Sequence, residues 1–214
     1  SRGLGDVYKR QTLYKGVREW FARINAYGAA RGIRILHYIN SSGLKEIIEG
    51  TEIAHEFRRI YACSFLYDID GVAYWPAVAV NYTNKTQFIF KINKGVESVF
   101  DSKLVNQYIE EDKRPVPFRR MIYVGDGTTD IPCMRLVKNS GGHSIAVYNP
   151  EIRNARRELN GLIRDNRVSH VCPADYSEGS EMDTLVKTII DKIEADHRLE
   201  LLETPRTSVS STHL

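Results

Sequence analysis

The sequence predicts an α/β fold whose central sheet is mostly parallel. Extended segments of four to seven residues alternate with helical segments along the chain, and this alternation is typical of helices packed on a parallel sheet. One pair of extended segments, 59–68 and 72–80, breaks the alternation, and "DIDG" (68–71) between them predicts a β-hairpin flap over 59–80. With 214 residues, 42% hydrophobic and 27% charged, the chain has the composition of one globular domain with a small insert.

The first half of the chain predicts three helices and one strand besides the hairpin. One helical face carries Val17, Trp20, Phe21, Ile24 and Tyr27, which predicts a helix over 16–31. A strand follows at 33–39 and ends at "NSSG" (40–43), and a short helix follows at 44–50. Residues 83–95 predict a helix with Thr83 or Asn84 as its N-cap and Gly95 at its end.

The second half continues the alternation. It predicts strands at 120–124, 143–148 and 168–171, and helices at 130–142, 150–162 and from Met182 to Ile193. Pro132 falls in the first turn of its helix, where a missing N–H is tolerated.

The two ends of the chain differ from this pattern. Residues 1–11 lack an apolar period and resemble a string that recurs at the ends of gene predictions from environmental assemblies, so we expect a non-native leader. Residues 199–214 include a polar, Ser/Thr-rich stretch and are expected to be a disordered tail. The folded domain is therefore expected over 12–198.

Composition excludes several classes of protein. The net charge of +3 is spread along the chain, whereas a nucleic-acid-binding protein usually shows a clustered basic stripe, so no nucleic-acid partner is expected. Three separated cysteines without metal-ligand spacing predict a reducing compartment and neither a disulfide framework nor a zinc site. No apolar run approaches ~18 residues and no signal-peptide pattern occurs, so we expect a cytoplasmic protein without a membrane span.

Polar side chains follow two of the expected strands. "NSSG" contains Ser41, Ser42 and Gly43, and "GDGTTD" (125–130) contains Asp126 and Asp130. Ligands bind at the carboxyl ends of strands in open parallel sheets, and Lys85 begins a helix, where anions are also favoured. Hydroxyl, ammonium and carboxylate groups in one pocket would suit phosphoryl transfer with Mg²⁺.

Each of these features also has an ordinary structural interpretation. Gly-Asp-Gly after a strand is often only a turn, and the two serines suit helix N-caps. Lys85 taken alone is a typical surface lysine. Their joint order and placement favour the functional interpretation.

The segments "INSSGLKE", "YTNKTQ" and "YVGDGTTDIPCM", in this order, resemble motifs two, three and four of the haloacid dehalogenase-like superfamily of hydrolases. The hairpin before the lysine is similar to the phosphoserine-phosphatase-like branch, and the resemblance covers about residues 12–195. It implies a Rossmann-like three-layer fold and a Mg²⁺-dependent phosphomonoester hydrolase that acts on a small phosphorylated metabolite.

The resemblance also implies roles for individual residues. Ser41 matches the motif-two hydroxyl that binds the phosphoryl group, with Ser42 as a substitute and Gly43 in the same loop. Lys85 matches the lysine that steadies the charged intermediate, and Lys91 and Lys94 are weaker alternatives. Asp126 matches the metal-binding acid, and Asp130 matches the second acid, which supports the metal or orients the lysine. Gly125 and Gly127 are expected to shape this loop by unusual torsions or close approach.

Motif one of the superfamily, a strand followed by Asp-x-Asp, has no match in the expected place. Only Asp6 and Glu19 precede Ser41 as carboxylates, and neither follows an apolar strand. Asp68 and Asp70 have the right spacing but lie after motif two, where a hairpin turn is the favoured interpretation and a rearranged active site the alternative. We therefore expect an N-terminally truncated, catalytically incomplete phosphatase that lacks its nucleophile and first catalytic strand. Two rivals stay open, namely a non-enzymatic phosphate- or cation-binding module and a dehalogenase-type hydrolase.

Overall fold

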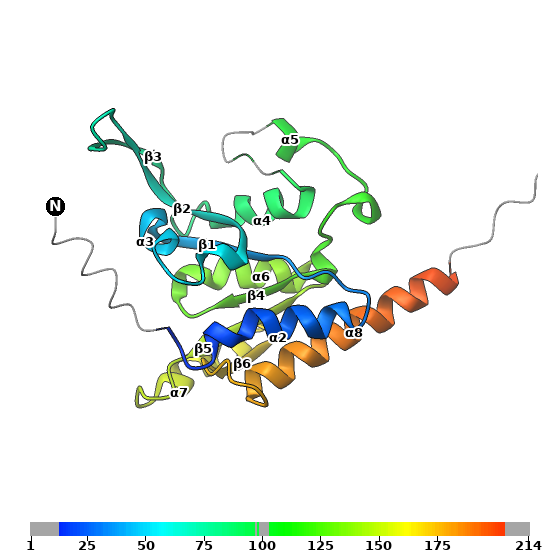
Figure 1. The fold of residues 1–214 in the computed structure, drawn as a ribbon. Coiled ribbons are helices and arrows are strands. Elements are labelled where there is room, and N and C mark those ends of the chain that lie inside the picture. The colour runs from blue at the N-terminus through cyan, green and yellow to red at the C-terminus, as the bar shows by residue number, and fades with distance from the viewer. Residues whose placement is uncertain (1–12, 97, 99–102, 204–214) are drawn as a thin grey trace, which may run out of the picture.

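The computed structural model describes residues 13–96, 98 and 103–203. It consists of two three-stranded sheets flanked by helices (Figure 1). The chain is thus α/β with mostly parallel sheets, as the alternation of segments predicts. The expected leader at 1–11 and residues 204–214 of the expected tail lie outside the described residues.

The first sheet has the order β1-β2-β3 and the second the order β4-β5-β6. The strands are β1 (His37–Leu44), β2 (Phe57–Tyr67), β3 (Ala73–Val78), β4 (Ile122–Gly125), β5 (His143–Tyr148) and β6 (His170–Pro173). Neighbouring strands are parallel throughout, except that β2 and β3 form the antiparallel hairpin that the sequence predicts.

Seven α-helices and four short 3₁₀ segments make up the rest of the described secondary structure. The helices are α2 (Val17–Ala29), α3 (Lys45–Glu49), α4 (Lys85–Lys94), α5 (Lys103–Asn106), α6 (Ile131–Asn139), α7 (Ala155–Arg164) and α8 (Glu181–Glu203). The 3₁₀ segments are η1 (Ala54–Glu56), η2 (Glu111–Lys113), η3 (Phe118–Arg120) and η4 (Thr128–Asp130). No helix in the described ranges combines the length and apolar character needed to cross a bilayer.

One hydrophobic cluster lies between the sheets and the helix pair α2 and α8. Its buried members are Trp20, Phe21, Ile24, Ile145, Val147, Cys172, Ala174, Met182, Val186, Ile189 and Ile190. Phe57 of the first sheet and Ile122 of the second pack against the same cluster. One helix layer therefore covers both sheets.

A second cluster lies on the opposite face, under α4 and α6. Its buried members are Tyr61, Val80, Phe88, Ile89, Ile92, Phe118, Met121, Cys133 and Val137. Tyr38 of β1 and Tyr123 of β4 pack against it, so this helix layer also covers both sheets. The two sheets consequently lie edge to edge in one layer, between two layers of helices.

The junction between the two sheets lies between β1 and β4. Helix α4 packs on β1, α6 packs on β4, and the two helices contact each other. Among the described residues, β1 pairs only with β2, and β4 pairs only with β5. The central layer is thus interrupted at β1 and β4, beside the loops that carry the predicted site residues.

Several predicted boundaries are wrong. The strand expected at 33–39 begins at His37 and continues through Leu44, because Ile33 and Ile35 pack against the α2/α8 cluster outside the sheet ladder. Helix α8 continues to Glu203, so residues 199–203 of the expected disordered tail are helical. Asn84 is the N-cap of α4, but its side chain bonds to Ala79 and Asn81 in the preceding loop and does not cap the helix.

Candidate functional site

The loop after β4 carries one exposed and one buried carboxylate. Asp126 directly follows the strand and is exposed, whereas Asp130 ends η4, is buried, and is the N-cap residue of α6. A Cβ atom on Gly125 would lie 2.6 Å from the Cβ of Asp130, which no real side chain tolerates. Gly125 is therefore needed for the close approach that the sequence predicts, because only glycine leaves room for Asp130.

Gly127 does not have the predicted special conformation. Its φ of −133° is an extended value that any residue adopts, and an added Cβ would meet nothing closer than 3.8 Å. Of the two glycines expected to shape the loop, only Gly125 is sterically required.

Lys85 and Asp130 form a buried ion pair. The ammonium Nζ of Lys85, at the first residue of α4, donates to Oδ1 of Asp130 at 2.7 Å, and the two side chains are 5% and 9% exposed. A buried charge is stable only when it is paired, so each residue depends on the other. Two of the residues that we expect to converge, Lys85 and Asp130, are thus in direct contact, and the interpretation of Lys85 as a surface lysine is wrong.

Tyr123 is a third member of the cluster. Its hydroxyl donates to the same Asp130 Oδ1 at 2.7 Å from the strand that precedes the loop. Burial is the largest cause that raises the pKa of Tyr123 above its ordinary value, followed by the neighbouring Cys133 and Asp130. The phenol therefore remains a neutral donor to the carboxylate.

Asn40 and Cys133 extend the cluster towards β1. The Asn40 amide donates to the backbone carbonyl of Lys85 at 3.1 Å and approaches Sγ of Cys133 at 3.8 Å. Burial raises the pKa of the Cys133 thiol to about 11, so it stays protonated near neutral pH. The amide oxygen Oδ1 of Asn40 is buried without a hydrogen-bond partner in the described part of the chain. A buried acceptor without a donor is costly, so this oxygen marks a place where a donor is needed.

Ser41, Ser42 and Gly43 lie in a β-bulge and not in a loop after the strand. Asn40 pairs with Tyr61 and Leu44 pairs with Cys63, so Ser41, Ser42 and Gly43 of β1 lie opposite a single residue of β2. The Ser41 hydroxyl accepts a hydrogen bond from the Gly43 N–H at 3.0 Å, and Ser42 is exposed. Leu44 is the N-cap of α3 and makes no side-chain cap bond, so the alternative interpretation of the serines as caps is wrong.

The predicted groups are only partly brought together. Ser41 directly follows Asn40 and so begins the bulge beside the cluster, but its hydroxyl bonds within the bulge. Asp126 makes no hydrogen bond or ion pair to any other described residue, and its charge contributes to raising the pKa of Tyr176, after burial and Cys172. Within the described ranges, no three His, Cys, Asp or Glu side chains are grouped closely enough to hold a metal.

The alternative candidates have other structural roles. Lys91 donates to the Ser98 carbonyl, and Lys94 donates to the carbonyls of Val105 and Gln107. In "DIDG", Oδ1 of Asp68 accepts from the N–H groups of Asp70 and Val72, which confirms the predicted hairpin turn. Asp68 and Asp70 are both exposed.

Sequence reasoning missed Asn40, Tyr123 and Cys133 as members of the site. A signal was present for Tyr123, because a polar-tipped residue inside the apolar run "MIYV" needs a partner for its hydroxyl when buried. Asn40 and Cys133 carry no such signal, since their contacts depend on how α4 and α6 pack.

No family model matches the chain. The chain is 29% identical to an uncharacterized protein of Borreliella burgdorferi, over 217 aligned residues that cover 90% of this chain and 70% of that protein. This relative has no assigned activity, so nothing about function transfers from it.

Proposed function

We propose that this chain forms most of a Mg²⁺-dependent phosphomonoester hydrolase of the haloacid dehalogenase-like type, acting on a small phosphorylated metabolite. The observation that carries the proposal is the buried pair of Lys85 and Asp130, whose carboxylate lies in the same loop after β4 as the exposed Asp126. A lysine fixed by a carboxylate beside a second, available carboxylate suits a site that must neutralise phosphoryl oxygens and hold a cation.

The interrupted central layer supports the idea that one more strand completes the site. β1 and β4 are the edges that flank the junction, and neither pairs across it among the described residues. Asn40 is the last residue of β1 before the bulge, and its buried Oδ1 lacks a donor, which a backbone N–H could supply. We propose that a strand from outside residues 1–214 inserts here, joins the two sheets into a Rossmann-like layer, and carries Asp-x-Asp.

The proposed reaction proceeds in two displacements. The first Asp of the inserted strand attacks phosphorus, the P–O ester bond breaks, and the second Asp gives its proton to the leaving alcohol. Water then attacks the aspartyl phosphate, gives a proton to the second Asp, and releases inorganic phosphate. Lys85 donates to a phosphoryl oxygen, while Asp130, which also accepts from the Tyr123 hydroxyl, holds the Lys85 ammonium in position.

Asp126 is the proposed metal-binding residue of this chain. Mg²⁺ is commonly held by one or two carboxylates together with waters and substrate oxygens, so an isolated exposed carboxylate fits it. When bound, the ion would neutralise charge on the transferring group. Oδ1 of Asp130 already accepts two hydrogen bonds, so this residue is better suited to orient Lys85 than to bind the metal.

Adding the missing strand tests the proposal. A chain extended at its N-terminus by an apolar strand and Asp-x-Asp is expected to hydrolyse p-nitrophenyl phosphate when Mg²⁺ is present. A matched extension with Asn in place of the first Asp should be inactive, because it cannot form the covalent intermediate. Halide release from a 2-halo acid that survives a chelator, without hydrolysis of the phosphate ester, would instead favour the dehalogenase-type chemistry, which needs no metal.

The non-enzymatic module is the remaining alternative. It is favoured if the DNA upstream of this gene segment encodes no strand with Asp-x-Asp in the same frame. The three free cysteines agree with the reducing, cytoplasmic setting that we propose for either function.

A further inference from the structure

The β2–β3 hairpin presents apolar side chains to solvent. Figure 1 shows the hairpin projecting from the helix and sheet layers near α3, on the side opposite to the C-terminal end of α8. Ile69 at its tip is fully exposed (101%), and Trp75 is 65% exposed. Phe65, Leu66, Tyr67, Val72 and Tyr74 of the same hairpin are exposed as well. A cluster of exposed apolar residues of this size marks an interaction surface.

The tip of the hairpin has a defined shape. Asp68 accepts from the backbone N–H groups of Asp70 and Val72 at 3.0 and 2.8 Å, and Gly71 adopts a φ of +75°. These bonds form a tight turn that presents Ile69 between the carboxylates of Asp68 and Asp70. The tip is therefore an apolar side chain with a negative charge on either side.

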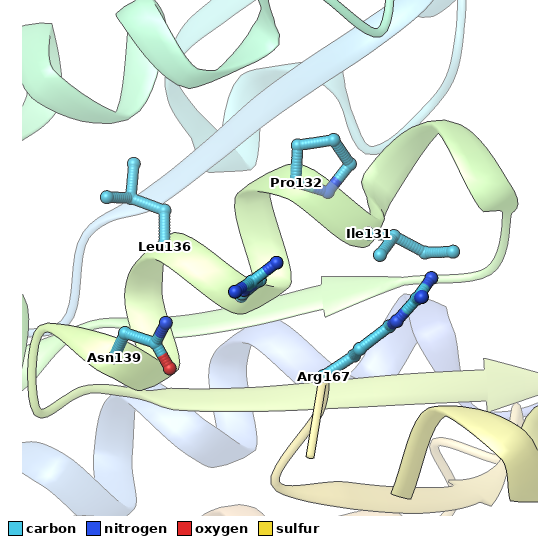
Figure 2. Close-up of a pocket in the computed structure, with 6 residues that line it drawn as sticks. Ile131, Pro132, Leu136, Asn139 and Arg167 are labelled. Carbon is cyan, nitrogen blue, oxygen red and sulfur yellow. The ribbon is translucent and has the colours of Figure 1, made fainter. Parts of the chain in front are cut away.

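A groove with the opposite charge lies along α6. It has a volume of about 500 Å³ and is lined by Ile131, Pro132, Arg135, Leu136, Asn139 and Arg167. Figure 2 shows Ile131, Pro132 and Leu136 along the helix, with Arg167 extending towards Ile131 from the segment before β6. Three apolar residues thus share the groove with two guanidinium groups, of which Arg167 also forms a long, exposed ion pair with Asp165 (3.9 Å).

Arg167 is held in place by α6 itself. The ammonium of Lys138 in α6 donates to Oδ1 of Asn166 at 2.5 Å and to the carbonyl of Val168 at 2.9 Å. These bonds link α6 to the residues on both sides of Arg167. The Arg167 N–H donates to the Leu162 carbonyl at 2.7 Å. Arg135 is exposed and makes no ion pair or hydrogen bond to another described residue. Its guanidinium is therefore available to a ligand.

We propose that the hairpin tip of one copy of this chain docks into the α6 groove of a second copy. The tip has the apolar Ile69 between two carboxylates. The groove has apolar side chains together with the guanidinium groups of Arg135 and Arg167, so both charge and polarity are complementary. The hairpin projects away from its own α6 (Figure 1), so the partner groove belongs to another molecule. Each copy contributes one tip and one groove, so every docking contact joins two different surfaces of the chain.

Charge exchange between Asp70 and Arg135 tests the docking on the 214-residue chain. Neither side chain makes another bond among the described residues, so Asp70→Lys and Arg135→Glu should leave the fold intact. Sedimentation velocity over a roughly hundredfold concentration range should show that the unmodified chain self-associates and that each variant associates at least about tenfold more weakly. An equimolar mixture of the two variants should associate again, because each tip then meets a groove of opposite charge. Arg153→Glu, the same charge change on an exposed arginine outside the groove, is the control and should associate normally.

Three outcomes would overturn the proposal. The unmodified chain could remain monomeric at every concentration, or it could associate equally well after Arg135→Glu. Both single variants could also weaken association without recovery on mixing. Ile69→Ser separates the apolar contact from the charges, and unchanged association of this variant would likewise contradict the proposed docking.

Discussion

The ammonium of Lys85 lies 2.7 Å from the carboxylate of Asp130, and both side chains are more than nine-tenths buried. Lys85 begins α4, and Asp130 precedes α6, so the ion pair joins the two helices that cover β1 and β4. The same contact is the centre of the proposed active site. Stability and the proposed function therefore involve the same pair of charges, so several experiments can test the pair.

Removal of one partner should be strongly destabilising. Lys85→Met leaves a carboxylate buried without its cation, so we expect a loss of about 3–5 kcal/mol in the free energy of unfolding. Urea unfolding of the variant measures this loss. Lys192→Met is the matched control, because its pair with Asp196 is 58% and 49% exposed and should contribute less than about 1 kcal/mol. Equal losses in the two variants would contradict the burial of the Lys85 pair.

Gly125 and Gly127 should respond differently to the same substitution. Gly125→Ala brings a methyl group to 2.6 Å from Asp130, so a loss of about 1–3 kcal/mol is expected. Gly127→Ala meets no close atom at an ordinary φ and should be neutral or stabilising by up to about 1 kcal/mol, through lower entropy of the unfolded chain. Thermal unfolding of both variants measures the difference, and a tolerated Gly125→Ala would show that Asp130 can move away.

Tyr123→Phe removes one of the two donors to Oδ1 of Asp130. The buried carboxylate then lacks a hydrogen bond, which should cost about 1–3 kcal/mol. Tyr108→Phe, at a residue that is 82% exposed, is the control and should be close to neutral. In a double-mutant cycle with Asp130→Asn, the effects of Tyr123→Phe should not be additive. Additive effects would mean that the hydroxyl does not act through Asp130.

Alkaline pH should destabilise the fold through its buried thiols. Burial raises the pKa of Cys133 from its ordinary value of 9.0 to about 11, so between these values the unfolded chain loses a proton that the folded chain keeps. The contribution of the protonated Cys133 thiol to the free energy of unfolding is fully present below about pH 9. It decreases as the pH rises towards 11. Cys133→Ala should flatten this fall in unfolding experiments repeated across that pH range. An unchanged slope would show that the Cys133 thiol is not protected by burial.

The order and type of most elements follow from local pattern. The helix at 17–29, the hairpin around "DIDG", and the strand, turn and helix through "GDGTTD" were all predictable from apolar spacing and turn residues. The start of β1 was not, because Ile33 and Ile35 have the composition of a strand but are half-buried against the α2/α8 cluster without strand pairing. Burial and strand pairing produce the same apolar signal in a sequence.

The site was predictable in its charged residues but not in its arrangement. Lys85 and Asp130 could be predicted as partners from the order of the motifs, whereas the bulge at Ser41–Gly43 depends on the register between β1 and β2. The contact between Tyr123 and Asp130 depends on how closely η4 folds back on β4, which Gly125 permits. Such contacts come from tertiary packing, which a single sequence does not encode in any local pattern.

The most direct test of the proposed function is the rate of p-nitrophenyl phosphate hydrolysis by the chain extended with an apolar strand and Asp-x-Asp. With Mg²⁺ present, the account predicts hydrolysis that disappears when the first Asp of the extension is replaced by Asn, and that falls by about 100-fold or more in Asp126→Asn. A well-folded, metal-loaded extended chain that does not hydrolyse the ester, or one whose Asp126→Asn variant retains the full rate, would contradict it.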